Sequence, residues 1–172
     1  MTRAQNLGLG VIQVVWPAEP LRQDMDLCVP VVLSHTSFDA DGRLTKTTLT
    51  AILNEVEAIR ARSYAARRAR VVVDLQAFAV AAGTVAHLQP DGTVDVQHGG
   101  RRIRVQPVVG HPESQLIHDT HDSCSSAGPD TVGAIVFDDL GLYPSKNAHL
   151  RWLNTYLPVR AVGVSELPVW LS

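Results

Sequence analysis

The chain has 172 residues, of which 15 are Lys or Arg and 17 are Asp or Glu, so its formal net charge is −2. This balance excludes a strongly basic protein of the histone type and a polyacidic tail. Hydrophobic residues make up 45% and charged residues 19%, which is typical of a globular chain rather than a disordered one. The length predicts a single domain over residues 1–172, because domains cluster around roughly 100–200 residues.

Three features predict a cytoplasmic protein without a membrane span. Only two cysteines occur, Cys28 and Cys124, which is too few for a disulfide scaffold and favours free thiols. The longest apolar stretch, residues 77–86, is about half of what crosses a bilayer. Residues 7–16 lack the preceding charges and the following cleavage site of a signal peptide.

The sequence of the first half of the chain predicts two strands, then a helix and then a third strand. Residues 11–16 and 27–34 are apolar and rich in β-branched side chains, which is typical of strands. A helix is expected over about residues 45–67, because apolar positions recur there at the helical period and Thr45 can cap its start. Residues 70–75 contain three consecutive valines and predict a short buried strand.

The second half begins with a predicted antiparallel meander. Residues 85–89, 93–97 and 102–109 alternate apolar and polar side chains, and the sequences Pro-Asp-Gly and His-Gly-Gly between them are typical of hairpin turns. Residues 110–131 show no clear period and predict a long loop rich in His, Asp and Ser. The elements expected after this loop are a strand, a helix and a final strand with an extension, at residues 133–138, 145–157, 159–164 and 168–171.

These elements together predict an α/β fold with a mixed sheet. Its two main helices span about residues 45–67 and 145–157, and its antiparallel meander lies near residues 85–109. No internal repeat or low-complexity segment interrupts this pattern.

Acidic residues follow several predicted strands. Asp74 closes the valine strand, and Asp138 and Asp139 close residues 134–137. Ligands of α/β sheets bind outside the carboxyl ends of the strands, so these three carboxylates are expected to meet at one edge. Clustered carboxylates repel one another unless a cation neutralises them, and oxygen ligands suit Mg²⁺ or Mn²⁺. The alternative is that each Asp only caps a turn.

A histidine cluster lies in the predicted loop. His111, His118 and His121 fall within eleven residues, and Cys124 follows them. A helix over residues 114–123 would bring His118 and His121 together, and imidazole and thiolate are zinc ligands. We therefore expect a divalent metal (Zn²⁺, Mg²⁺ or Mn²⁺), with His118 or His121 as ligand or general base; the alternative is a solvated loop. The predicted metal ligands are Asp74, Asp138, Asp139 and His111.

Arginine dominates the basic residues, since 13 of the 15 are Arg. Arg102 and Arg104 share one face of a predicted strand. Guanidinium groups bind phosphate in a bidentate manner, so these two residues are predicted to bind a small anionic ligand or substrate. Only 5% of residues are aromatic, which argues against a surface for single-stranded nucleic acid. The alternative is an exposed hairpin face.

Three functional interpretations follow. The first is a metal-dependent hydrolase of a phosphate-bearing or similar anionic substrate, in which a metal-bound water attacks the substrate. The second is a noncatalytic binding or assembly module, such as a homo-oligomer, that pairs through exposed sheet edges. The third is an enzyme with Cys124 as nucleophile, activated by His118 or His121. The first requires Asp74, Asp138 and one histidine within about 6 Å of each other.

Overall fold

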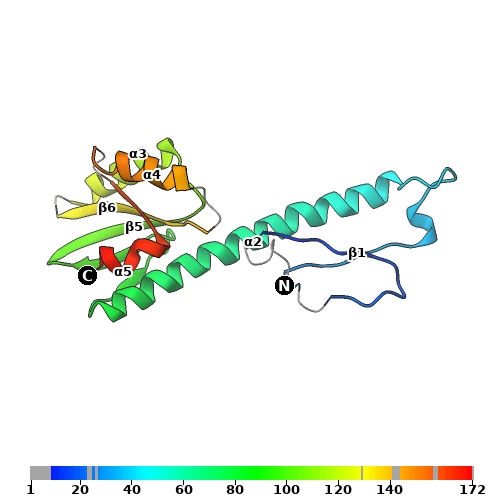
Figure 1. Cartoon of the computed structure of the whole chain (residues 1–172), viewed down its shortest axis with the longest axis horizontal. Helices are drawn as coiled ribbons and strands as arrows, with labels where there is room; N and C mark the ends of the chain where they lie inside the picture. Colours follow the sequence, from blue (N-terminus) through cyan, green and yellow to red (C-terminus); the bar gives the residue numbers. More distant parts are fainter. Residues whose placement is uncertain are drawn as a thin grey trace. The chain divides into compact units, whose positions relative to one another are not determined.

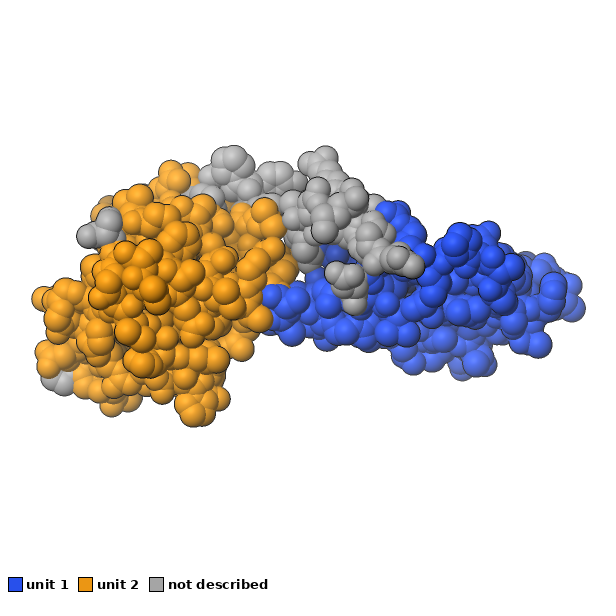
Figure 2. All heavy atoms as spheres, turned by 90° about the horizontal axis from the view of Figure 1, so that it is seen from below, with its two compact units in different colours: residues 1–66 blue, residues 67–172 orange. Residues whose placement is uncertain are grey.

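The structure, a computed structural model, forms two compact units, residues 1–66 (unit 1) and residues 67–172 (unit 2), which Figure 2 colours separately. One helix begins in unit 1 and ends in unit 2, so the prediction of a single domain stays a prediction. The structure describes residues 9–22, 25, 27–128, 130–140, 144–156 and 159–171.

Unit 1 contains two very short strands and a turn of 3₁₀ helix. The strands β1 (Val14–Val15) and β2 (Val31–Val32) pair in parallel, and η1 (His35–Ser37) follows them. Trp16 stacks on Phe38 with 5.6 Å between the ring centroids, which ties the end of β1 to the turn after η1. The two strands predicted in this region are therefore confirmed over two residues each.

The helix α2 (Lys46–Ala81) starts where the sequence predicts a start. The hydroxyl of Thr45 accepts a hydrogen bond from the backbone N–H of Thr48 at 3.3 Å, which is the geometry of an N-cap. The helix then continues well past its predicted end at residue 67. No described helix, α2 included, is both long and apolar enough to cross a membrane.

The strand predicted over residues 70–75 is wrong, because these residues lie inside α2. Val71 and Leu75 are four residues apart and are both buried, whereas Val73 between them is 60% exposed. This burial follows the helical period, whereas a strand would place the side chains of residues 71, 73 and 75 on one face. Packing of the apolar face on the sheet of unit 2 therefore overrides the strand preference of the valines.

Unit 2 is built on a five-stranded sheet with the order β3-β4-β5-β6-β7. The first three strands form an antiparallel meander, as predicted, and β6 and β7 extend the sheet in parallel. The prediction of an α/β fold with a mixed sheet is confirmed. The strands are β3 (Ala86–Leu88), β4 (Val94–His98), β5 (Arg101–Val109), β6 (Thr131–Asp138) and β7 (Arg160–Gly163).

Two segments of unit 2 that were predicted as a loop and as a strand are helical, so these two predictions are wrong. Most of the loop predicted at residues 110–131 is a helix, whose buried side chains are Ile117, Thr120 and Cys124. The strand extension predicted at residues 168–171 is also helical, with a proline in its first turn. The helical elements are α3 (Ser114–Ala127), α4 (Pro144–Leu153), η2 (Val164–Glu166) and α5 (Leu167–Trp170).

The helix predicted over residues 145–157 corresponds to α4, which ends earlier, at Leu153. A turn covers residues 154–156, and residues 157 and 158 lie outside the described residues.

Helices cover both faces of the sheet of unit 2 (Figure 1). The end of α2 and the short α5 pack on one face, where Ala134 and Val136 of β6 are buried. On the other face, Ile135 packs against α3 and Phe137 packs against α4. Successive residues of β6 therefore point to opposite layers, and burial on both faces explains why this strand is an unbroken apolar run.

The two outer strands of this sheet offer few backbone groups to a further strand. The N–H of Ala161 in β7 donates to Oδ1 of Asn154 at 2.8 Å, and the carbonyl of Ala161 accepts a hydrogen bond from the amide Nδ2 of the same side chain. Asn154 thus occupies the backbone N–H and carbonyl of Ala161, with which a further strand would pair. The other outer strand, β3, has only three residues. Pairing through these edges is disfavoured, and the sheet-edge interpretation stays a prediction.

Candidate functional site

A pocket of about 280 Å³ lies where β6 and β7 end, and we call it the carboxyl-edge pocket. Its volume is near the lower limit of small-molecule sites, which is about 300 Å³. The three predicted acids line it together, although Asp74 comes from α2 and not from a strand end. The lining residues are Arg70, Val71, Asp74, Asp138, Asp139, Leu140, Val164 and Ser165.

Asp138 is buried and pairs with two arginines of α2. Its Oδ2 accepts hydrogen bonds from Nε of Arg67 at 2.7 Å and from Nη2 of Arg70 at 3.0 Å, and its Oδ1 accepts one from the N–H of Leu140 at 3.0 Å. Burial alone would raise the pKa of Asp138, but these bonds, led by that from Arg67, hold the pKa below its ordinary value. Asp138 is therefore an ionised carboxylate that joins α2 to the end of β6.

The other two carboxylates of the pocket, those of Asp139 and Asp74, can accept further hydrogen bonds. Oδ2 of Asp139 accepts a hydrogen bond from the hydroxyl of Ser165. A Cβ at Gly163 would lie 2.7 Å from that oxygen, so a glycine lets the carboxylate lie across β7. Asp74 forms no hydrogen bond or ion pair with any residue that the structure describes. The pocket thus presents two acceptor groups beside three apolar side chains.

The histidines do not join these acids. His118 and His121 are exposed on α3, His111 is half-buried just after β5, and none of the three lines the carboxyl-edge pocket. Within the described ranges, no three His, Cys, Asp or Glu side chains gather closely enough to hold a metal ion. The predicted Zn²⁺, Mg²⁺ or Mn²⁺ site therefore has no support in the structure. The residues predicted to ligate it were Asp74, Asp138, Asp139 and His111.

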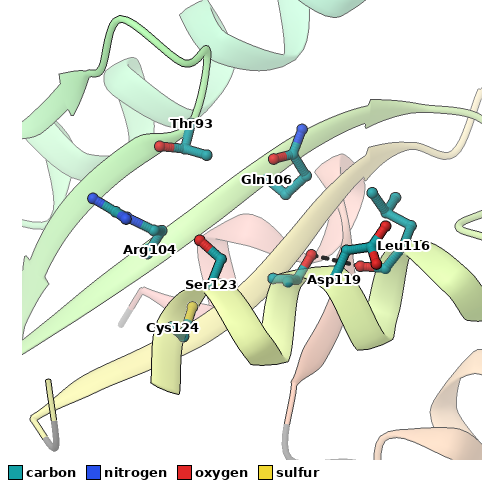
Figure 3. A pocket seen from close by; sticks show the side chains of 8 residues that line it. Thr93, Arg104, Gln106, Leu116, Asp119, Ser123 and Cys124 are labelled. Atoms are coloured by element: carbon teal, nitrogen blue, oxygen red, sulfur yellow. Dashed lines mark hydrogen bonds between the residues drawn. The ribbon is translucent and has the colours of Figure 1, made fainter. Parts of the chain in front are cut away.

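A second pocket, of about 90 Å³, lies between the sheet and α3, and we call it the α3 pocket. Figure 3 shows Arg104 and Gln106 of β5 on one side of it and Ser123 and Cys124 of α3 on the other. The structure therefore brings together one predicted anion-binding arginine and the predicted nucleophile. The lining residues are Thr93, Arg104, Gln106, Leu116, Asp119, Thr120, Ser123 and Cys124.

The two predicted anion-binding arginines share a carboxylate of the protein itself. Asp95 lies opposite Arg104 in the β4–β5 pairing and is buried. Nε of Arg104 donates to its Oδ1 at 3.3 Å, and Nη2 of Arg102 donates to its Oδ2. Burial alone would raise the pKa of Asp95, but the bonds from Arg102 and Arg104 outweigh it and lower that pKa. Anion binding by these arginines stays a prediction.

Cys124 is not placed as a reactive thiol. It is 4% exposed, and burial raises the pKa of its thiol. No hydrogen bond joins it to His118 or His121 in the described part of α3. A Cβ at Gly133 would lie 3.0 Å from its Sγ, so the thiol packs directly on β6. Because the thiolate is the nucleophile, this environment does not favour the cysteine-enzyme interpretation.

In the folded protein, Cys124 is expected to react with iodoacetamide at least about tenfold more slowly than Cys28, because the Cys124 thiol is more deeply buried and so better shielded from the reagent. Cys28 is half-buried, and its Sγ accepts a hydrogen bond from the N–H of Gln13 at 3.1 Å. Peptide mass spectrometry over time measures both rates, and the chain unfolded in urea is the control. Faster alkylation of Cys124 in the folded protein would contradict this placement.

Three residues were missed by the sequence analysis: Arg70 and Ser165, which line the carboxyl-edge pocket, and Arg67, which pairs with Asp138. Arg67 and Arg70 lie one helical turn apart on α2, and Asp74 lies one turn further. This spacing would have grouped them if the helix had been extended past residue 67. Ser165 lies beyond the last strand and carries no signal in the sequence.

Comparison with known protein families, curated proteins and solved structures found no match. The fold and the two pockets therefore define the class of protein, which is a mixed α/β protein with small pockets beside its sheet. The proposals below depend on the geometry of these residues alone.

Proposed function

We propose that the protein is a noncatalytic ligand-binding module whose carboxyl-edge pocket takes a small molecule through an ammonium group. The observation that carries this proposal is the presence of two carboxylates with free capacity, those of Asp74 and Asp139, beside apolar walls. Polar groups that converge in an apolar pocket at the carboxyl ends of parallel strands are typical of a binding site.

The charge of the pocket favours a cation. Asp74, Asp138 and Asp139 carry three negative charges, and Arg67 and Arg70, which both pair with Asp138, carry two positive ones, so the cluster has a net charge of −1. An ammonium group has three donors and no acceptor, which matches carboxylates that only accept. An anionic group would be repelled by the carboxylates of Asp74 and Asp139, so the pocket favours a cationic ligand over an anionic one.

The chemistry of the lining residues favours binding over catalysis. The described lining contains no His, Cys or Lys, and its one hydroxyl, on Ser165, already donates to Asp139. General acid–base catalysis needs a group that titrates near the working pH. The pKa of Asp138 is shifted downward, away from that range.

The proposal is tested by titrating the full chain with n-butylammonium chloride and with sodium butyrate in a calorimeter. The two probes contain the same number of carbon atoms and carry opposite charges. We expect binding of n-butylammonium alone, weakened about tenfold by Asp74→Asn and by Asp139→Asn, because each substitution removes a charged acceptor. Asp119→Asn, in the α3 pocket, is the matched control and should leave the affinity unchanged.

Two results would contradict the proposal. One is tighter binding of butyrate than of n-butylammonium. The other is tight binding of Mn²⁺ that Asp138→Asn abolishes, which would favour the metal-dependent hydrolase instead.

A further inference from the structure

One face of α2 within unit 1 is apolar at its ends and charged in its middle. Leu53, Glu57, Arg60 and Tyr64 recur at intervals of four, three and four residues, so they share one side of the helix. Leu53 is 63% exposed, Tyr64 is 51% exposed, and the two charged residues are also exposed. We call this surface the 53–64 face. Its members are Leu49, Leu53, Val56, Glu57, Arg60 and Tyr64.

The chain itself covers a different side of this part of α2. Oε1 of the buried Glu55 accepts a hydrogen bond from the N–H of Val29 at 2.8 Å, and Nε of Arg62 donates to the carbonyl of Leu27 at 2.8 Å. Ile59, on the same side, is buried. The segment before α2 is therefore fixed on that side, and the 53–64 face stays open to solvent.

The two charges in the middle of the 53–64 face have no partner within the described chain. Neither Glu57 nor Arg60 forms an ion pair or hydrogen bond with a described residue, although they lie three positions apart on the helix. Isolated exposed charges are common, but here they are flanked on both sides by exposed leucine and tyrosine side chains. Apolar surface of this kind marks an interaction site when it is contiguous.

We infer that two copies of this chain pair through their 53–64 faces as antiparallel helices. A two-fold axis between positions 58 and 59 places Glu57 opposite the partner's Arg60, and Arg60 opposite the partner's Glu57. The same axis places Leu53 opposite the partner's Tyr64 at both ends. The interface thus consists of two symmetric ion pairs between two symmetric apolar contacts.

The order of residues along the face identifies a second copy as the occupant. A two-fold interface must be self-complementary, because the same patch of both subunits meets in opposite directions. The order apolar, acidic, basic, apolar meets this condition, since reversal places opposite charges together and apolar groups together. Parallel helices would place Glu57 beside the partner's Glu57 and Arg60 beside the partner's Arg60, and like charges in contact are destabilising.

The experiment is sedimentation velocity of the full chain over a range of concentrations. Wild type is expected to approach twice its 18.6 kDa mass as concentration rises. Glu57→Arg alone and Arg60→Glu alone replace both ion pairs by like charges, so each is expected to weaken self-association about tenfold or more. An equimolar mixture of the two variants should form a mixed dimer, and the double variant Glu57→Arg with Arg60→Glu should dimerise again.

Two further variants separate this interface from loss of folding. Asp41→Arg reverses an exposed charge in unit 1 away from the face and should leave dimerisation unchanged. Leu53→Ser should weaken dimerisation while the circular dichroism of the monomer keeps its helical signal. A wild type that stays monomeric at every concentration would overturn the inference. A dimer that both single charge reversals leave intact, or that the mixture and the double variant fail to restore, would overturn it as well.

Discussion

Leu75→Ala is expected to lower the free energy of unfolding by about 3 kcal/mol, because truncation of a buried leucine loses transfer free energy and leaves a cavity. Leu75 is fully buried in the core of unit 2, where it packs with Val71 and Ala79. Val73→Ala, two residues away, should change that free energy by less than about 0.5 kcal/mol, because Val73 is 60% exposed. Urea denaturation of the two variants measures both values.

This pair of substitutions separates a helix from the strand that the sequence predicts over residues 70–75. A strand would place residues 73 and 75 on the same face, so both truncations would have similar effects. In the helix the two side chains point in nearly opposite directions. Equal losses for Val73→Ala and Leu75→Ala would contradict the course of α2 through unit 2.

Asp138→Ala is expected to lower the free energy of unfolding by about 3 kcal/mol, because it leaves the largely buried guanidinium of Arg67 without its carboxylate partner. The side chain of Arg67 is only 15% exposed, and its Nε donates to Asp138 at 2.7 Å. The matched control is Asp122→Ala on the exposed side of α3, which should change stability by less than about 0.5 kcal/mol. Similar unfolding midpoints for the two variants in urea would contradict the structural role of Asp138.

The same variant has an expected pH dependence. The pKa of Asp138 is lower in the folded chain than its ordinary value, which is about 3.9 in an unfolded chain. Its contribution to stability is therefore complete above about pH 4 and is lost as the pH falls through the lower folded pKa. Urea denaturation in the acid range should show the difference between wild type and Asp138→Ala shrinking as the pH falls, and a growing difference would contradict the sign of the shift.

The full length of α2 could have been predicted from glycine and proline, which are absent between Gly42 and Gly83. Gly83 has a φ of +73°, and the N–H of Thr84 bonds to the carbonyl of Ala79 at 2.9 Å, which is a common helix C-terminal motif. The three valines before Asp74 instead favoured a strand. Intrinsic preference is a weak guide, and packing against the sheet of unit 2 decides the outcome.

The helix α3 was harder to predict, since two of its three buried residues, Thr120 and Cys124, are not strongly apolar. Its boundaries did carry a signal, because a proline precedes it and Gly128 follows it. The meander was predicted correctly from its turns. Its two-residue turn at Gly99 and Gly100 also fixes the register that places Asp95 opposite Arg104. This ion pair was not among the predictions made from the sequence.

The rule that ligands bind at the carboxyl ends of strands explains only part of the carboxyl-edge pocket. Asp138 and Asp139 lie at the end of β6, which is where that rule places ligand-binding residues. Asp74 reaches the same pocket from a helix, so its position there does not follow from the predicted strand. The arginines that neutralise Asp138 depend on the path of α2, which the sequence analysis ended too early.

The most direct test of the proposed function is a ¹H–¹⁵N NMR titration of the uniformly labelled full chain with n-butylammonium chloride. The account predicts that the largest shifts occur at the backbone amides of Leu140, Val164 and Ser165, and that Asp139→Asn removes them. Sodium butyrate at the same concentration should leave these amides unmoved. Shifts confined to the α3 pocket, or equal shifts with butyrate, would contradict the account.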